Sequence, residues 1–340
     1  MAYKDAKVYF DGSHYIAIPH TTKNFVPRKP KSPEEQIIIN EESTPARNTD
    51  VPSLPITDLE TIEKETLFQD RSNLEKKPQN KRKITLKEFF EELYSKALEL
   101  PRKQRKNTVI QGMKKYFKTE KDCIRYVELN FDRKLRNLIC RRVRMTRKAF
   151  LATFNYFCTF TYSDILHSEK SFKKKLRTCL RNFSYRHNWV YMGIWERAPK
   201  TKRLHFHGLF FIPENTLPGE ISEVKDFNTK THSMQLTYQS TYFNRHFGRS
   251  DFKKIDEEDN LLNNALAYLM KYIEKTGERI VYSKGLPQFF VSDILDEDIV
   301  CTIGQEDKKL LLYDNFKCIY EGVVIGKVSK EVIKELRKVN

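Results

Sequence analysis

The sequence predicts an α+β fold in which a mainly antiparallel central sheet is flanked by helices and preceded by a flexible N-terminal region. Between residues 151 and 285, short aromatic and β-branched runs typical of strands alternate with runs of helical period. A turn-like basic segment, residues 197–202, joins two of the strand-like runs, as expected of an antiparallel pair. Eight of the thirteen prolines fall between Pro19 and Pro78, where no apolar period is sustained.

The first half of the chain is expected to hold few strands. Residues 8–18 form two short β-prone runs around an Asp-Gly turn, which predicts a small hairpin. Residues 19–78 are interpreted as a flexible linker. A helix should begin after Thr85, acting as the N-cap, and end before Pro101. Residues 102–148 predict a basic helical segment with one face on a core and the other either facing phosphate or simply solvated.

The second half carries the predicted sheet. Residues 155–162 indicate a buried strand, residues 168–186 a helix, and residues 189–196 and 203–212 an antiparallel pair of strands. A loop, a helix near 238–247, a short strand at 251–255 and a strong helix at 260–275 should follow. From Arg279 onward, short strand-like runs lead to a charged helix at 330–338. The expected division is therefore 1–84 hairpin and linker, 85–150 basic helices, 151–285 central domain, and 286–340 an extension of unknown role.

The charge of the chain favours a polyanionic partner, with nucleic acid first among the candidates. Lysine and arginine total 62 against 45 acidic residues, giving a net charge of +17 and a pI near 9.4. A membrane-surface protein can be equally basic, but we find no lipidation signal, secretory signal or apolar run near twenty residues. We expect a soluble, cytoplasmic protein. The six cysteines are scattered without metal-site spacing, which agrees with a reducing compartment.

A His-x-His pair is the first candidate site. In a strand, His205 and His207 point to one face while Leu204, Phe206 and Phe210 point to the other. Two imidazoles at this spacing can hold a divalent metal, although a structural or surface role is an open alternative for the pair alone. Glu196 ends the preceding strand, so a short hairpin would bring its carboxylate toward the pair, unless it forms a salt bridge with Arg197 or Arg203.

A tyrosine-rich helix is the second candidate site. At about 100° per residue, the apolar residues of 260–275 gather on one side, whereas Tyr268, Lys271, Tyr272 and Lys275 gather on the other. Two phenols and a lysine on one face can approach the same substrate phosphate. The alternative is that these amphipathic side chains simply cover a surface.

The ordered set formed by FCTFTY (157–162), Glu196 with LHFHGLFF (204–211), and YLMKY (268–272) resembles the three motifs of HUH-type rolling-circle replication initiators of phages and plasmids. The resemblance covers roughly residues 150–285 and implies an HUH endonuclease domain with an RRM/ferredoxin-like fold. It implies that Glu196, His205 and His207 bind Mg²⁺ or Mn²⁺. It also implies that Tyr268 is the first nucleophile, that Tyr272 is the second, as in the two-tyrosine branch, and that Lys271 assists the phosphate or leaving group.

The activity implied by this resemblance is site-specific nicking and joining of single-stranded origin DNA, through a 5′-phosphotyrosine intermediate and a free 3′-OH. No G-x-x-x-x-G-K-[ST] sequence is present, so a host helicase and DNA polymerase are expected partners, in a bacterial host cytoplasm. Three other functions stay open. A relaxase or single-strand transposase shares the chemistry, a metal-dependent hydrolase would use water, and a basic binding protein would have structural histidines.

Overall fold

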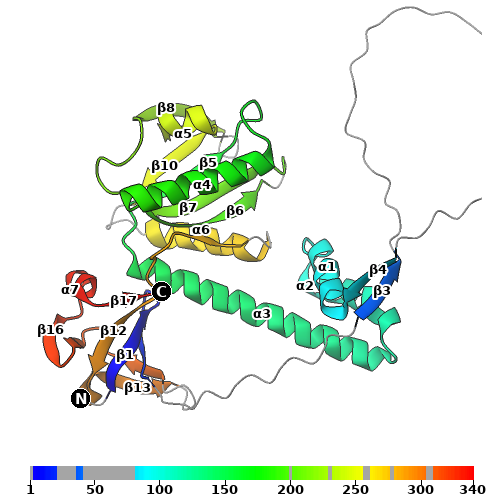
Figure 1. Ribbon diagram of the computed structural model, residues 1–340, viewed down its shortest axis with the longest axis horizontal. Helices are drawn as coiled ribbons and strands as arrows, with labels where there is room; N and C mark the ends of the chain where they lie inside the picture. The colour runs from blue at the N-terminus through cyan, green and yellow to red at the C-terminus, as the bar shows by residue number, and fades with distance from the viewer. Residues whose placement is uncertain are drawn as a thin grey trace, which may run out of the picture. The chain divides into compact units, whose positions relative to one another are not determined.

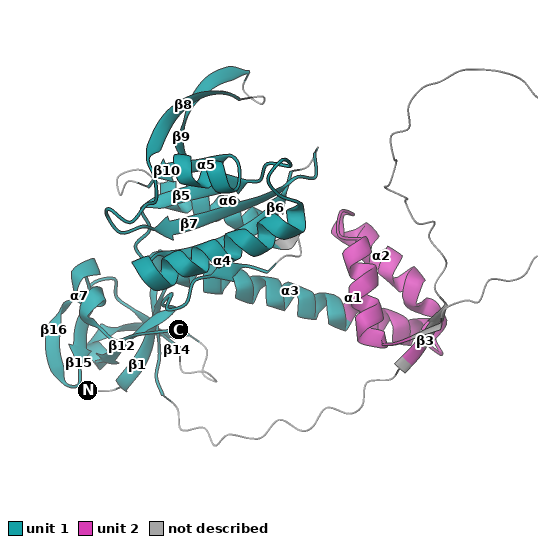
Figure 2. Ribbon diagram, turned by 45° about the horizontal axis from the view of Figure 1, so that its top comes forward, with its two compact units in different colours: residues 1–26, 129–340 teal, residues 27–128 magenta. Residues whose placement is uncertain are grey.

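The computed structural model describes residues 3–20, 36–40, 81–198, 201–228, 232–255, 261–275, 279–303 and 309–340. It divides into two compact units, one formed by residues 1–26 and 129–340 and the other by residues 27–128 (Figures 1 and 2). Both units combine helices with antiparallel strands, which confirms the predicted α+β class.

The unit of residues 27–128 is a small helical body with one strand pair. Thr85 caps its first helix as predicted, because its hydroxyl accepts a hydrogen bond from the Glu88 amide while the Glu88 carboxylate accepts one from the Thr85 amide. Its elements are β3 (Gln36–Asn40), β4 (Lys81–Thr85), α1 (Leu86–Lys96), α2 (Arg102–Met113), the 3₁₀ turn η1 (Lys114–Tyr116) and the beginning of α3 (Glu120–Leu151).

The predicted linker at residues 19–78 contains one described strand. β3 pairs with β4 in antiparallel register, with Ile38 opposite Lys83. The three isoleucines of β3 supply the β-branched side chains that favour an extended chain. Apart from β3, Pro19 and His20, this stretch lies outside the described residues.

A five-stranded antiparallel sheet forms the centre of the other unit, in the order β10-β5-β7-β6-β11. The pair predicted at 189–196 and 203–212 is confirmed, since β6 and β7 are antiparallel neighbours over their full length. The strands are β5 (Tyr156–Thr161), β6 (Val190–Arg197), β7 (Leu204–Phe211), β10 (Ser250–Lys254) and β11 (Val281–Tyr282).

Helices cover both faces of this sheet (Figure 1). α4 (Glu169–His187), as predicted at 168–186, packs on the face that carries Phe206 and Phe210. α6 (Leu261–Lys275) and the later part of α3 pack on the opposite face against Leu209 and its neighbours. This division follows from the two-residue period of β7. Close strand packing requires Gly193, where a Cβ would lie 2.5 Å from the His207 carbonyl oxygen.

The loop expected after β7 contains a second strand pair. β8 (Ile221–Asn228) and β9 (Ser233–Ser240) form a two-stranded hairpin, visible beside β10 in Figure 2. The helix predicted near 238–247 is shorter, because β9 continues to Ser240, whose hydroxyl then caps α5 (Thr241–His246).

The hairpin predicted at residues 8–18 is confirmed as β1 (Tyr3–Phe10) and β2 (Tyr15–Ile18). It belongs to a larger sheet, the terminal sheet, ordered β13-β14-β2-β1-β12-β15-β16, in which β17 also pairs with β12. The two ends of the chain thus share one core, although the sequence treats them as separate segments. The later elements are β12 (Phe289–Ile294), η2 (Asp296–Asp298), β13 (Ile299–Ile303), β14 (Lys309–Leu312), β15 (Lys317–Tyr320), β16 (Val323–Lys327), α7 (Lys330–Glu335) and β17 (Lys338–Val339).

Several cations of the basic helical segment serve packing. Arg105 is buried and bonds to the carbonyls of Leu98 and Leu100. In α3, the buried Lys148 ammonium donates to the Leu286 carbonyl at 2.6 Å, and the Arg147 guanidinium lies 4.2 Å from the centre of the Tyr9 ring. Within the described parts of the chain, none of the helices has both the length and the apolar composition needed to cross a lipid bilayer.

Candidate active site

A row of polar side chains crosses the sheet on the face covered by α6. The register of β5, β7 and β6 places Thr161, His205 and Glu196 side by side, because each is directly opposite the next. One step along the strands, Thr159 lies opposite His207. Side chains opposite one another in neighbouring strands point to the same face, so these groups form one polar cluster.

Each histidine is oriented by a threonine of β5. The Nδ1 atom of His207 is 3.0 Å from the Thr159 hydroxyl oxygen, and that of His205 is 2.8 Å from the Thr161 hydroxyl oxygen. If Nδ1 carries the proton and donates it to threonine, Nε2 keeps its lone pair for a metal. Burial, followed by the charges of His207 and Arg203, lowers the pKa of His205 to about 4, so this imidazole is neutral at physiological pH.

Glu196 connects the histidines to α6. Its carboxylate is 5% exposed, and Oε2 lies 2.9 Å from the Nε2 atom of His207. The Tyr268 hydroxyl donates a hydrogen bond to the same oxygen at 2.8 Å. Burial alone would raise the pKa of Glu196, but hydrogen bonds from His207, Tyr268 and Tyr272 outweigh it and lower the pKa. The carboxylate is therefore ionised at neutral pH.

The two arginines considered as alternative partners of Glu196 are paired elsewhere. The Arg197 guanidinium binds Glu169 at the start of α4. The Arg203 guanidinium binds Asp164 in the loop after β5.

Tyr268 is held between the sheet and solvent. Its ring is 36% exposed and lies 5.2 Å from the His207 ring, in an edge-to-face arrangement. Burial of the hydroxyl, followed by the hydrogen bond and negative charge of Glu196, raises the pKa of Tyr268 well above its usual value. The phenol is thus protonated, and its proton is directed at a carboxylate.

Tyr272 and Lys271 occupy different surroundings. The Tyr272 ring centre is 4.9 Å from that of Tyr268, one helical turn away. Burial raises the pKa of Tyr272, and contacts with Tyr268 and Glu196 also influence it. Lys271 is exposed on α6.

A cavity of about 740 Å³ brings the predicted site residues together. Its lining includes Glu196, His205, His207 and Tyr268, whereas Lys271 and Tyr272 are not part of it. The structure therefore groups four of the six sequence-predicted site residues around one space. A fifth, Tyr272, contacts one of the four.

Three further residues of this cavity escaped the sequence analysis as site components. Asp251 on β10 lies opposite Thr159 and so belongs to the same sheet face as His207. Arg203 and Arg249 also line the cavity and supply positive charge beside it. The threonines left a signal, since Thr159 and Thr161 repeat the two-residue spacing of the histidines. Asp251 left none, because its strand pairing is invisible in the sequence.

The donor set of this face suits a divalent cation. Two imidazole nitrogens and one ionised carboxylate leave further coordination positions for substrate oxygens and water. Within the described residues, no group of three or more histidine, cysteine, aspartate or glutamate side chains converges as a complete metal site in this conformation. Instead, Glu196 is engaged by the His207 ring and the Tyr268 hydroxyl. Binding of an ion would require these side chains to adjust.

Comparison with known proteins gives one finding. No curated protein and no solved structure matches the chain. Residues 155–277, which run from the start of β5 to just beyond α6, match a family model of replication-associated proteins, described as Replication-associated protein ORF2. The match covers about a third of the chain and includes every residue of the polar cluster described above. Over this region, the chain is similar to replication-associated proteins.

Proposed function

We propose that this protein is a replication initiator that cleaves single-stranded origin DNA with Tyr268 and later rejoins the strand. The observation that carries the proposal is the hydrogen bond of 2.8 Å from the Tyr268 hydroxyl to Glu196, beside two histidines that face the same cavity. A merely structural tyrosine does not require an ionised carboxylate and two neutral-capable imidazoles around its hydroxyl. The similarity of residues 155–277 to replication-associated proteins supports the substrate class.

In the cleavage step, the Tyr268 phenolic oxygen forms a bond to the scissile phosphorus while the bond from phosphorus to the 3′-oxygen breaks. The hydroxyl proton passes to Glu196, which already accepts its hydrogen bond. The leaving 3′-oxygen takes up a proton and becomes a free 3′-OH. Since one phosphate ester replaces another, attack by a 3′-OH on the 5′-phosphotyrosine reverses the reaction without ATP.

Glu196, His205 and His207 would hold Mg²⁺ or Mn²⁺, whose charge polarises the scissile phosphate and stabilises the leaving oxygen. Thr159 and Thr161 keep the two imidazole rings oriented through Nδ1. Arg203 and Arg249 add positive charge at the rim for the phosphates that flank the cleaved bond.

The second tyrosine gives the proposed reaction its repeat capacity. Tyr272 lies one turn from Tyr268, so a modest shift of the DNA or of α6 would bring its hydroxyl to the scissile position. It would then cut the regenerated origin while the first 5′ end is still attached. The exposed Lys271 would assist a phosphate oxygen or the leaving group. A host helicase and DNA polymerase would extend the free 3′-OH.

The experiment that tests this function is incubation of the full chain with single-stranded origin DNA and Mn²⁺, followed by a denaturing gel. We expect a species that migrates above the 40.5 kDa protein and carries the DNA label. Excess chelator should prevent its formation. Cleavage products without any protein-linked DNA would indicate a water-dependent hydrolase and contradict the proposal. Binding without cleavage would indicate a non-catalytic protein.

A further inference from the structure

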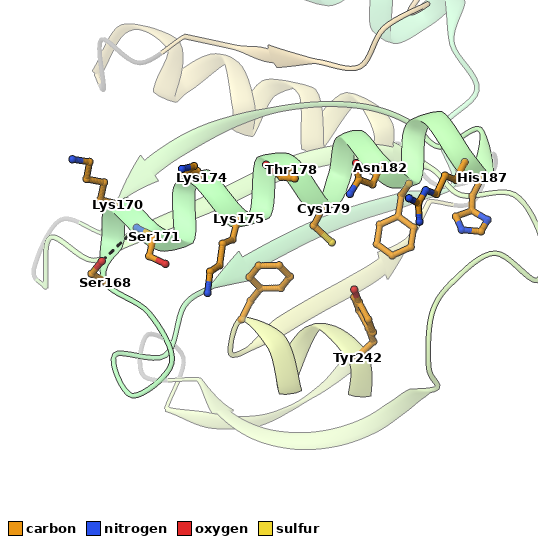
Figure 3. A pocket seen from close by; sticks show the side chains of 13 residues that line it. Ser168, Lys170, Ser171, Lys174, Lys175, Thr178, Cys179, Asn182, His187 and Tyr242 are labelled. Atoms are coloured by element: carbon orange, nitrogen blue, oxygen red, sulfur yellow. Dashed lines mark hydrogen bonds between the residues drawn. The ribbon is translucent and has the colours of Figure 1, made fainter.

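A basic groove lies between α4 and α5, on the face of the five-stranded sheet opposite Tyr268 (Figure 3). Its volume is about 790 Å³, slightly larger than the cavity around Glu196. α4 and Phe243 of α5 share the hydrophobic core on this face, so the groove has rigid walls. We propose that it binds a second segment of the single-stranded DNA, away from the cleaved bond. This inference rests on the proposed function for its choice of substrate.

The charge of the groove is of one sign. Lys170, Lys174, Lys175 and Arg186 line it, and no aspartate or glutamate is among its described lining residues. Within the described part of the chain, none of these four cations has an ion-pair or hydrogen-bond partner. A concave surface with unpaired cations and no carboxylate favours a polyanion such as the phosphate backbone of DNA.

The catalytic cavity differs from the groove in this respect. The guanidinium of Arg203 is bound by Asp164, and that of Arg249 by Asp226. Their charges are therefore partly neutralised and held in place. The cations of α4 that line the groove have no such partners among the described residues, so a ligand would supply the missing negative charge.

Aromatic side chains give the groove its second property. Phe183, Tyr242 and Phe247 contribute to its lining, and Figure 3 shows Tyr242 of α5 and Lys175 of α4 directed toward the same space. The amide of Asn182 and the hydroxyl of Thr178 add hydrogen-bonding groups along α4. Aromatic faces that stack unpaired bases, beside cations that contact phosphates, are the combination that binds single strands without sequence preference.

The dimensions suit a short strand. From Lys170 to Arg186, α4 rises by about 24 Å. A nucleic-acid strand places roughly one phosphate every 3.4 Å, so this length spans about seven nucleotides. That number lies within the site size of roughly 4–16 nucleotides found for single-strand binding folds.

The groove and the catalytic cavity are also continuous along the chain. Ser163, Asp164 and Ile165 line the cavity, and Ser168 and Lys170 line the groove. Only two residues separate the two linings, so a strand leaving the cavity at this loop meets the beginning of α4. The groove would thus hold the flank of the substrate while Tyr268 acts on the scissile phosphate.

The binding test uses the full chain, a fluorescently labelled 20-nucleotide deoxythymidine strand and a chelator, so that nicking chemistry plays no part. We compare Lys174→Gln/Lys175→Gln with the control Lys327→Gln/Lys334→Gln, which removes two exposed lysines of the terminal sheet and α7. The groove variant should reduce the slope of log affinity against log salt by about 1.4, because each phosphate contact on a single strand contributes about 0.7. The control should leave the slope unchanged. Equal slopes for both variants and the wild type would overturn the proposal.

The stacking test concerns Tyr242. Tyr242→Ala should weaken binding of the same strand by roughly 5- to 100-fold, as expected for loss of one stacked base, whereas Tyr242→Phe should bind like the wild type. Ultraviolet crosslinking of a strand containing iododeoxyuridine should place adducts on peptides with Tyr242 or Phe183. Crosslinks confined to the catalytic cavity would contradict the groove, as would equal losses on a duplex of the same length. If the groove variants behave as expected but no Tyr268 adduct ever forms, the proposed nicking fails while the groove stands.

Discussion

The two large sheets of the main unit both bury carboxylates, but they bury them for different purposes. In the terminal sheet, Asp293 is 1% exposed, and its two oxygens accept hydrogen bonds from the backbone amides of Asp5 and Gly322 at 2.9 and 3.0 Å. Asp298 accepts one from the amide of Leu295 at 3.0 Å. Backbone amides cannot change protonation state at physiological pH. These carboxylates therefore fix the chain path and nothing more.

In the five-stranded sheet, the equally buried Glu196 has partners of another kind. Both of its short contacts come from ionisable side chains, His207 and Tyr268. Groups that can give up or take up protons and face a cavity are what a reaction requires. The partners of a buried carboxylate, rather than its burial, therefore separate a structural role from a chemical one.

The largest effect should follow from removing the proposed nucleophile. Tyr268→Phe keeps the ring packed against His207 but removes the attacking oxygen, so the rate of adduct formation should fall by roughly 10³-fold or more. Tyr272→Phe should still form the first adduct and lose repeated turnover or strand transfer. Single-turnover and multiple-turnover cleavage of labelled origin DNA measure both. A Tyr268→Phe protein that nicks at the normal rate would remove Glu196 from its proposed role as well.

The next effect concerns the metal. His205→Ala or His207→Ala should lower nicking by more than about 100-fold, because even residues that only orient a metal ligand contribute 10- to 100-fold. Affinity for the strand should change little, since it comes from many lysine and arginine contacts. Cleavage with Mn²⁺ and binding in chelator separate the two quantities. Undiminished cleavage in excess chelator would be incompatible with a metal at this face.

A crossed pair of substitutions tests the comparison itself. Glu196→Gln should abolish most nicking while changing the free energy of unfolding by no more than about 1 kcal/mol, since the amide still fits among polar partners. Asp293→Asn should do the opposite. Its amide group can accept only one of the two backbone hydrogen bonds, so stability should fall by roughly 1–3 kcal/mol with normal activity per folded molecule. Denaturant unfolding and nicking rates for both variants would reveal a reversed pattern if the assignment is mistaken.

The threonines that orient the histidines should give an intermediate effect. Thr159→Val or Thr161→Val removes the hydroxyl beside Nδ1 and should reduce metal affinity or nicking by about 10- to 100-fold. Thr237→Val is a matched control, because Thr237 is also buried but bonds to the Val224 carbonyl in the β8–β9 hairpin. Titration with Mn²⁺ measures the change. Equal behaviour of all three variants would mean that the β5 hydroxyls do not orient the site.

The smallest effect is a pH-dependent change in stability at Asp251. Burial raises the pKa of Asp251, so the folded state holds its proton more tightly than the unfolded chain does. Stability is therefore lost as the pH rises from the ordinary aspartate pKa of 3.8 through the raised value. Asp251→Asn should be more stable than the wild type at pH 7, by about 1 kcal/mol or less because the group is partly exposed. The difference should vanish below pH 3.8, and a destabilised variant at pH 7 would indicate a required charge.

The sequence predicted the central elements well because their periods are strong. The strand before α4, α4 itself, the β6–β7 pair and α6 begin and end within two residues of the expected positions. The two-residue period of β7 also placed His205 and His207 on the face opposite Phe206 and Phe210. These features depend only on local pattern.

Features that depend on distant pairing were missed. The contact of β1 with β12 joins residues almost 290 positions apart, and no local period reveals such a partner. The β8–β9 hairpin lies in a polar stretch without clear alternation, so the sequence predicted a loop. In the site, the histidine pair followed from its own strand. Thr159 and Asp251 entered only once β5 and β10 were known to lie beside it.

The most direct test of tyrosine attack is to map the covalent adduct. The full chain is incubated with single-stranded origin DNA and Mn²⁺, digested with a protease and a nuclease, and the nucleotide-bearing peptide is sequenced by mass spectrometry. We expect the nucleotide to be attached to Tyr268 after a single cleavage, with Tyr272 modified only under conditions of repeated turnover. DNA found solely on Tyr272, or on a tyrosine outside α6, would contradict the assignment of Tyr268 as the nucleophile.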